Sequence, residues 1–178
     1  MIRFSSLVVV VFLLSCVSSY ASKVVDVDTI CKNVDNSSFC LTLLKSKHGA
    51  DLVTLAQYTI DVTHIELNNT INLLRKLISQ SGGDPKAKAH YEYCLSLFGT
   101  GNGGAISSLK NAQQYLKNGD YFSLRVEANN IIADHSDCIN GGTPGIPAYP
   151  DKSILPKYAE VVFNVADIML FISLFLTK

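Results

Sequence analysis

The longest segment with a helical pattern runs from residue 51 to about residue 79 and contains neither glycine nor proline. Within it, apolar residues recur at spacings of four, three and four positions, at Leu67, Ile71, Leu74 and Ile78. This spacing places them on one side of an amphipathic helix. The stretch SGGDP should end that helix, because two glycines interrupt it and Asp-Pro is typical of the start of a new one. The sequence therefore predicts one long helix followed by a sharp break.

Four further segments show the same period, and glycine or proline separates most of them. They cover approximately residues 87–98, 105–116, 121–138 and 158–176. The breaks between them are the loop GTGNGG, a Gly-Asp corner at 119–120 and the loop NGGTPGIPAYP. We therefore expect an all-α protein.

The first 21 residues have the composition of a secretory signal peptide. Arg3 supplies a positive charge, LVVVVFLL is an apolar stretch too short to span a bilayer, and SYA matches a small-x-small cleavage site. Removal would leave residues 22–178 with one net negative charge and no basic cluster, which argues against nucleic acid as a partner. The tripeptides NSS at Asn36 and NNT at Asn68 are possible N-glycosylation sites on the same secretory route.

The last helical segment is apolar enough to resemble a membrane span or a lipid-anchor signal. Glu160, Asn164 and Asp167 are spaced i, i+4 and i+7, however, which places them on one face. Such a polar face is typical of a helix that closes a soluble bundle, and a cleavable hydrophobic tail should lack these acids. We therefore expect no membrane association after removal of the signal peptide.

The cysteines indicate an oxidising compartment. Cys16 lies in the signal peptide, which leaves four cysteines in the mature chain: Cys31, Cys40, Cys94 and Cys138. An even number in a secreted chain favours two disulfides, and the absence of a C-x₂-C pair argues against zinc. Three pairings are possible. The most economical one joins Cys31 to Cys40 across a hairpin of two short helices, and joins Cys94 to Cys138 between two apolar helix faces.

The sequence contains no recognisable catalytic arrangement. Neither G-x-S-x-G nor H-E-x-x-H occurs, and GTGNGG has no strand before it and no Lys-Ser/Thr after it. His90 and His135 lie on apolar helix faces and should be core histidines, whereas His48 should be solvated. No two histidines are spaced i, i+4, so no helical metal pair is predicted. We expect a protein without enzymatic activity, cofactor or metal.

These features resemble the plant invertase and pectin methylesterase inhibitor family over about residues 24–177. The likeness rests on a C-x₈-C hairpin behind a signal peptide and on the segments HYEYC, AISSLKNAQQYLKNGDYFSL and VADIMLFISLFL. It implies that the first two and the last two cysteines pair. It also implies one domain at 22–178, with an N-terminal helical hairpin at 22–48 and an up-and-down four-helix bundle at 51–177.

Members of this family bind a carbohydrate-active enzyme in the cell wall or vacuole and cover its substrate cleft. The same module also occurs as the pro-region of some pectin methylesterases. No catalytic domain follows in this sequence, so we expect the free inhibitor form.

The resemblance is nearer to the pectin methylesterase inhibitor branch. Invertase inhibitors tend to carry Pro-Lys-Phe after the Gly-Asp corner, where this chain has Tyr121, Phe122 and Ser123. We therefore expect a secreted inhibitor of pectin methylesterase in the apoplast or cell wall. Inhibition of invertase, or a secreted binding module without inhibitory activity, are the alternatives. The residues expected at the interface with the target enzyme are Ser107, Asp120, Tyr121, Phe122, Asp137 and Asn140.

Three of these positions depart from the pattern of that branch. Its members tend to carry acidic residues on the third bundle helix, a threonine before the fourth cysteine and an acid after it. This chain has Ser107, Asp137 and Asn140 at those places. Charged pairs across an interface can contribute several kcal/mol to a complex, so these departures predict a lower affinity or a different target.

Overall fold

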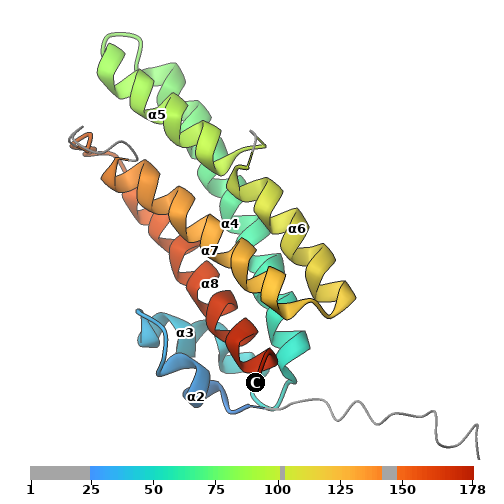
Figure 1. Ribbon diagram of the computed structural model, residues 1–178. Helices are drawn as coiled ribbons and strands as arrows, with labels where there is room; N and C mark the ends of the chain where they lie inside the picture. The colour runs from blue at the N-terminus through green and yellow to red at the C-terminus, as the bar shows by residue number, and fades with distance from the viewer. Residues whose placement is uncertain (1–24, 101–102, 142–147) are drawn as a thin grey trace, which may run out of the picture.

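A computed structural model describes residues 25–100, 103–141 and 148–178, and every regular element in these ranges is helical (Figure 1). The N-terminal elements are α2 (Val27–Cys31), α3 (Ser37–Leu44) and the short 3-10 helix η1 (Lys45–Lys47). The longer helices are α4 (Leu52–Gln80), α5 (Pro85–Phe98), α6 (Ala105–Asn118), α7 (Tyr121–Asn140) and α8 (Leu155–Leu176). The all-α prediction is confirmed. The predicted signal peptide lies outside the described residues.

The five longer helices form a bundle of four antiparallel rods. Both α4 and α7 pack against α5, α6 and α8. Helices α5 and α6 follow one another along the same side of the bundle, so together they make the second rod (Figure 1). The predicted up-and-down four-helix bundle is therefore confirmed, with its second helix interrupted between Phe98 and Ala105.

The interruption depends on Gly104, whose backbone lies directly against the end of α5. A Cβ atom at this position would lie 2.6 Å from the carbonyl oxygen of Gly99 and 2.8 Å from that of Leu97. Side-chain carbons do not approach backbone oxygens so closely, so the contact requires glycine. As a result α6 begins immediately beside the last carbonyls of α5.

Aspartate residues cap the first turns of α4, α5 and α7. The carboxylates of Asp51, Asp84 and Asp120 each accept a hydrogen bond from the backbone N–H three residues further on, at 2.8 to 3.0 Å. These bonds satisfy N–H groups that have no partner within the helix. The caps therefore fix the starting points of three of the five longer helices, including the predicted start at Asp84.

The predicted apolar faces meet in the centre of the bundle. Leu67 and Leu74 of α4, and Leu124 and Ile131 of α7, are completely buried. Full burial of a side chain of this size stabilises a protein by roughly 1.5–3 kcal/mol. The helical periodicity in the sequence therefore identified the core faces of both helices correctly.

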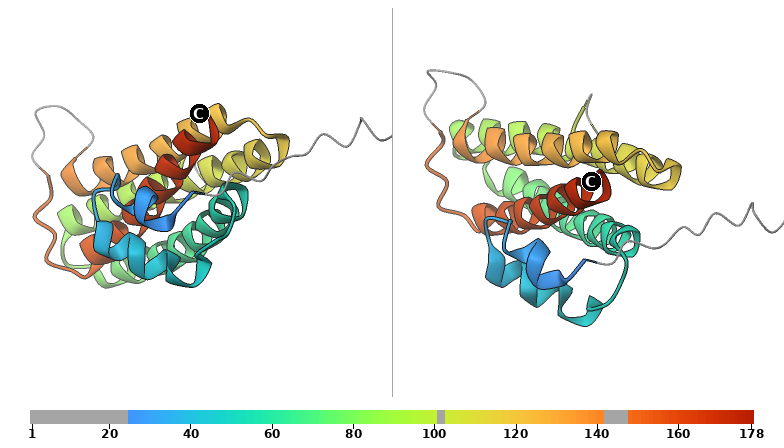
Figure 2. Two further views of the ribbon diagram at one scale, coloured as in Figure 1. Left: turned by 90° about the horizontal axis from the view of Figure 1, so that it is seen from below. Right: turned by 60° about the horizontal axis from the view of Figure 1, so that its bottom comes forward.

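Two disulfides hold the outer parts of the fold. Cys31–Cys40 closes the hairpin of α2 and α3, with the Cα atoms 5.4 Å apart. Cys94–Cys138 joins α5 to α7, with the Cα atoms 4.9 Å apart. Both predicted pairings are confirmed. The hairpin lies against one side of the bundle next to α8 (Figure 2).

Helix α8 is long and apolar enough to cross a membrane by length and composition. More than half of its most apolar stretch is buried inside the protein, however, where α8 packs between α4 and α7. This is the burial expected of a central helix in a bundle.

The polar face predicted on α8 is solvated only in part. Glu160 is exposed, but Asn164 and Asp167 expose only 7% and 6% of their surfaces. Asp167 lies beneath the N-terminal hairpin, and its Oδ2 atom accepts a hydrogen bond from the backbone N–H of Asp35 at 2.9 Å. The sequence therefore predicted correctly that these residues share one face of α8. Only part of that face contacts solvent, because Asp167 binds the hairpin.

Candidate functional site

The corner between α6 and α7 is a left-handed glycine turn followed by a helix cap. Gly119 has φ +71°, and the N–H groups of Gly119 and Asp120 donate to the carbonyls of Leu116 and Tyr115 at 3.2 and 3.0 Å. This pair of bonds is a Schellman motif, which favours glycine at the left-handed position. Asp120 then accepts the N–H of Ser123, and this bond holds the pKa of the Asp120 carboxyl below its usual value.

The two aromatic residues after the corner differ in exposure. Tyr121 is half-buried and packs against the core, whereas Phe122 is 60% exposed. The guanidinium carbon of Arg125 lies 4.8 Å from the centroid of the Phe122 ring, within the range of a cation–π contact. Phe122 is therefore a large apolar side chain that faces solvent at the start of α7, with Arg125 against its ring.

Asp137 and Asn140 lie at the opposite end of α7. Asp137 is half-buried, and Asn140 is exposed in the last turn. The disulfide from Cys138 to Cys94 fixes this end of the helix on α5. The two residues are consequently held on a rigid part of the bundle.

Asp134 lies one turn before Asp137 and has an unusual environment. Its Oδ2 atom is buried and has no hydrogen-bond partner among the described residues. Burial, together with the negative charge of Asp137, raises the pKa of the Asp134 carboxyl to about 7. Asp134 is therefore largely protonated in mildly acidic solution, and this end of α7 then carries less negative charge than the sequence suggests.

The six predicted interface residues do not meet at one point. Helix α7 has 20 residues, so its two ends lie about 30 Å apart. Asp120 and its aromatic neighbours are at one end, whereas Asp137 and Asn140 are at the other. Ser107 lies in the first turn of α6, level with the middle part of α7, as the nearby hydrogen bond from Asn111 to Glu127 indicates.

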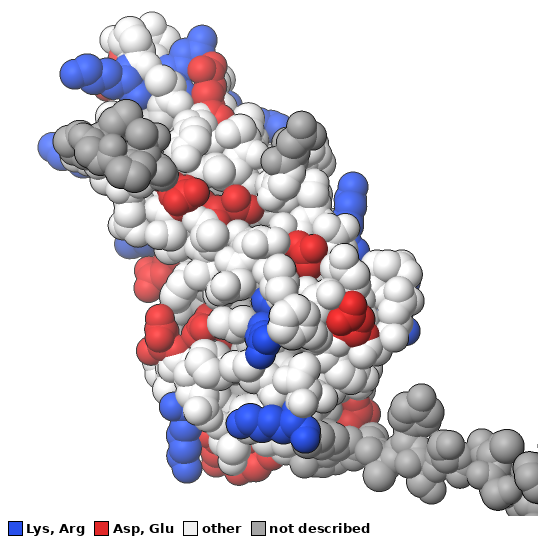
Figure 3. All heavy atoms as spheres, in the orientation of Figure 1, with Lys and Arg blue, Asp and Glu red and all other residues white. Residues whose placement is uncertain are grey.

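The exposed side of α7 connects Phe122, near the start of the helix, with Asn140 at its end. Six exposed residues recur there at spacings of four, three, four, three and four: Phe122, Val126, Asn129, Ala133, Ser136 and Asn140. We call this set the α7 stripe. It contains no charged residue, and the wider surface seen in Figure 3 carries scattered acidic and basic side chains with uncharged residues between them. The sequence prediction named only the ends of the stripe; the helical period, applied to the solvent side, would have identified the rest.

A cluster around His90 lies beside the Cys94–Cys138 disulfide, at the end of the bundle that carries Asp137 and Asn140, and has a structural role. The Nε2 atom of His90 is 3.8 Å from Oδ2 of Asp151, and both side chains are nearly buried. Tyr91 donates its hydroxyl to Asp151 at 2.9 Å, and the Tyr149 ring stacks on His90 at 4.7 Å. Burial lowers the pKa of His90, although Asp151 acts in the opposite direction. The nearest sulfur belongs to the disulfide of Cys94, so the cluster offers no free thiol nucleophile.

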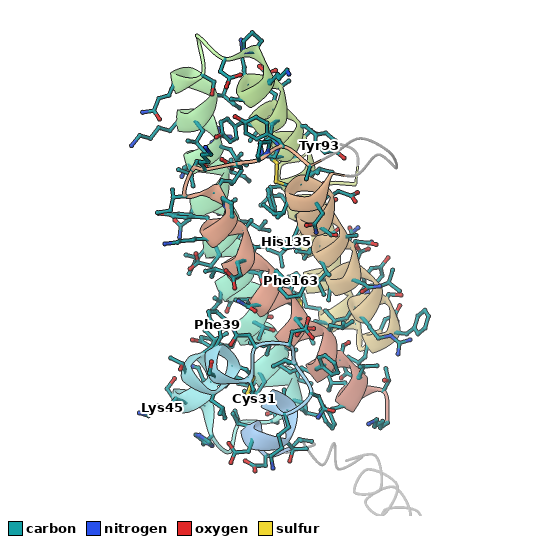
Figure 4. All side chains as sticks on the ribbon, turned by 90° about the vertical axis from the view of Figure 1, so that its left-hand side faces the viewer. Cys31, Phe39, Lys45, Tyr93, His135 and Phe163 are labelled. Atoms are coloured by element: carbon teal, nitrogen blue, oxygen red, sulfur yellow. A yellow bond between two sulfur atoms is a disulfide. The ribbon has the colours of Figure 1, made fainter. Side chains whose placement is uncertain are left out.

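Of the other two histidines with a predicted environment, His135 is half-buried instead of fully in the core, and His48 is exposed as predicted. His135 packs on Phe163 between α7 and α8, with the ring centroids 5.0 Å apart (Figure 4). Burial lowers the pKa of His135, whereas His48 is exposed. Within the described ranges, no group of three histidine, cysteine or acidic side chains could hold a metal ion.

Comparisons with known proteins agree with this architecture. The family model described as "Plant invertase/pectin methylesterase inhibitor" matches residues 25–172. A pectinesterase inhibitor from Actinidia deliciosa is 31% identical, over 96% of this chain and 91% of its own length. Pectinesterase inhibitor 1 from Arabidopsis thaliana is also 31% identical, over 72% of this chain and 71% of its own length.

Two crystal structures share the fold. A pectin methylesterase inhibitor from Arabidopsis thaliana has a TM-score of 0.62 at 26% identity, covering 85% of this chain and 96% of that one. Mutant form A of a pectin methylesterase inhibitor from Arabidopsis has a TM-score of 0.70 at 27% identity, covering 82% of this chain and 93% of that one.

Proposed function

Because the chain belongs to the plant invertase/pectin methylesterase inhibitor family, we propose that it inhibits a pectin methylesterase. The observation that carries this proposal is the similarity to the Actinidia deliciosa pectinesterase inhibitor, which extends over 96% of this chain. As a member of a family of enzyme inhibitors, the protein acts by binding and is not itself an enzyme.

The α6–α7 corner supports pectin methylesterase over invertase as the target. Invertase inhibitors tend to carry Pro-Lys-Phe after the Gly-Asp pair, and this chain has Tyr121, Phe122 and Ser123 instead. Proline and lysine are therefore replaced by one half-buried and one exposed aromatic ring. The pectinesterase inhibitors to which the chain is similar point to the same target.

The α7 stripe is the surface that we assign to target binding. Protein interfaces typically have an uncharged centre in which aromatic residues supply much of the binding energy. The stripe has this character, because it is exposed and uncharged along its whole length and begins at Phe122. Ser107 on the adjacent α6, and Asp120 and Asp137 beside the stripe, would then form its polar margin.

The bundle presents this surface in a rigid form. A Schellman turn and an aspartate cap fix one end of α7, and the Cys94–Cys138 disulfide fixes the other. A surface that is ordered before binding loses less conformational entropy when the complex forms. Inhibition then follows from occupying the entrance to the substrate cleft of the enzyme, with no chemical step on the inhibitor.

The proposed place of action is the cell wall. Two disulfides require an oxidising compartment, and the composition of residues 1–21 is that of a secretory signal peptide. The proposed target acts on wall pectin, so the inhibitor and the enzyme would meet outside the cell.

A paired enzyme assay tests the proposed target. The purified protein is titrated into a plant pectin methylesterase while acid release from esterified pectin is recorded, and into a plant invertase while hexose release from sucrose is recorded. We expect loss of esterase activity at micromolar inhibitor or below, with invertase unaffected. Inhibition of invertase alone would establish the alternative target. Inhibition of neither enzyme would favour a secreted binding module without inhibitory activity.

A further inference from the structure

A groove runs along α4 where the second rod of the bundle is interrupted. Its volume is about 500 Å³, and it lies between α4, the end of α5 and the start of α6. Its apolar walls are formed by Ile71 of α4, Leu95 of α5 and Ile106 of α6, and polar groups at its edge include Arg75 and Ser96. A shallow groove with apolar walls and a few polar groups is a typical setting for a bound organic group.

Asn68 lies in this groove and is the acceptor residue of the tripeptide Asn68-Asn69-Thr70. Its side chain is exposed, and its Nδ2 atom donates a hydrogen bond to the carbonyl of His64 at 2.8 Å. An N-linked sugar is attached through this nitrogen, which keeps one hydrogen after attachment, so the same donor remains available. Thr70 is buried in the folded chain, but this does not prevent attachment because oligosaccharide is transferred before the chain folds.

We propose that Asn68 carries an N-linked glycan whose first sugars lie in the groove between α4 and the interrupted second rod. Because Asn68 itself lines the groove, the first sugar is attached within reach of the groove walls. The C–H faces of a sugar ring can pack on Ile71, Leu95 and Ile106, while its hydroxyls can reach Arg75 and Ser96. The modification depends on entry into the secretory pathway.

The groove and the α7 stripe are separate surfaces of the bundle. The groove is formed by α4, α5 and α6, whereas α7 lies on the far side of the second rod from α4 and packs on α5, α6 and α8. A glycan on Asn68 therefore covers apolar groove surface without occupying the stripe proposed for target binding.

The first test is the mass of the secreted protein. Residues 22–178 are expressed in plant cells behind an established secretion leader, together with the variants Asn68→Gln and Ser38→Ala. Ser38→Ala is the matched control, because it removes the other tripeptide but keeps Asn36, whose Oδ1 atom caps α3. In wild type and Ser38→Ala we expect a glycopeptide that contains Asn68 and loses its glycan on treatment with peptide N-glycosidase. An unmodified Asn68 peptide in the secreted wild type would overturn the proposal.

The second test concerns the position of the sugar. Hydrogen exchange is compared between wild type and Asn68→Gln, once in the secreted forms and once in forms made without glycosylation. We expect exchange at residues 92–100 to be slower by about threefold in the secreted wild type only, with no difference along α7. Equal exchange at residues 92–100 in the two secreted forms would show that the glycan extends into solvent and does not lie in the groove.

Discussion

Asp167 of α8 accepts a hydrogen bond from the backbone N–H of Asp35, with 2.9 Å between Oδ2 and N. The two residues are 132 positions apart, and the bond joins the segment between α2 and α3 to the most buried helix of the bundle. Burial raises the pKa of the Asp167 carboxyl, whereas the hydrogen bond from the Asp35 N–H acts to lower it. The acceptor oxygen, more than the charge, should therefore hold the hairpin in place.

Substitution of Asp167 should separate these two contributions. Asp167→Ala leaves the Asp35 N–H without its acceptor and should lower the free energy of unfolding by about 1–3 kcal/mol. Asp167→Asn retains an acceptor oxygen and should cost much less. Urea unfolding of both variants measures the difference, with Glu160→Ala on the exposed part of α8 as the control. Equal losses in the Ala and Asn variants would show that the charge is what matters.

The two disulfides should stabilise the fold to different extents. Cys94–Cys138 closes a sequence separation of 44 residues and Cys31–Cys40 one of 9. The chain-entropy relation gives about 4 kcal/mol for the longer loop and about 2.6 kcal/mol for the shorter one. Paired alanine variants of each disulfide, compared by urea unfolding, check this order. A larger loss from the Cys31–Cys40 pair would mean that hairpin docking, not loop length, controls stability.

Asp134 should make stability decrease as pH rises. Its pKa is near 3.8 in the unfolded chain and about 7 in the folded protein, so the folded state binds more protons between these values. The stabilisation is complete below pH 3.8 and is lost as pH rises through about 7. Asp134→Asn, which has no such proton, should match wild type at pH 4 and exceed its stability at pH 8 by about 1–2 kcal/mol. This figure is discounted for solvent screening, because the residue as a whole is only half-buried.

Urea unfolding at a series of pH values measures the effect of Asp134. The exposed aspartate Asp61 provides the matched control, since Asp61→Asn makes the same chemical change at the surface of α4. If Asp134→Asn and wild type have parallel profiles from pH 4 to pH 8, the carboxyl is not held in the buried environment described here.

Gly119 should tolerate substitution less well than an exposed glycine without a positive φ, such as Gly82. Its φ of +71° is unfavourable for residues with a Cβ atom, so Gly119→Ala should cost about 1 kcal/mol, and Gly119→Asn less. Gly82 is the matched control. A Cβ atom would have open space at both positions, but only Gly119 has a φ in the left-handed region. Thermal unfolding compares the variants. Equal melting temperatures for Gly119→Ala and Gly82→Ala would contradict the left-handed turn.

Local sequence patterns predicted the helices and their breaks, and they placed Cys94 and Cys138 on apolar helix faces. The spacing of Leu67, Ile71 and Leu74 fixes one face of α4 whatever its neighbours are, and Gly-Asp at 119–120 carries its own turn and cap. Such features depend on residues within one or two helical turns. They can therefore be read from a single sequence.

Features that depend on how helices dock could not be predicted in this way. The alignment of α5 with α6 depends on the close approach of Gly104 to the carbonyls of α5, which no periodicity reports. Asp167 was placed on a polar face, yet it is buried because the hairpin covers it. The α7 stripe is a different case, because the helical period applied to the solvent side of residues 121–138 would have identified Val126 and Ala133 as well as the two ends.

The most direct test of binding through α7 is to place a charge within the α7 stripe, next to Phe122. Val126 and Val53 have nearly equal exposure, 43% and 41%, but Val53 lies at the start of α4, away from the stripe. Inhibition of pectin methylesterase is titrated with wild type, Val126→Glu and Val53→Glu. We expect Val126→Glu to weaken inhibition at least tenfold, about 1.4 kcal/mol, while Val53→Glu matches wild type. Equal inhibition by all three proteins would contradict binding through α7.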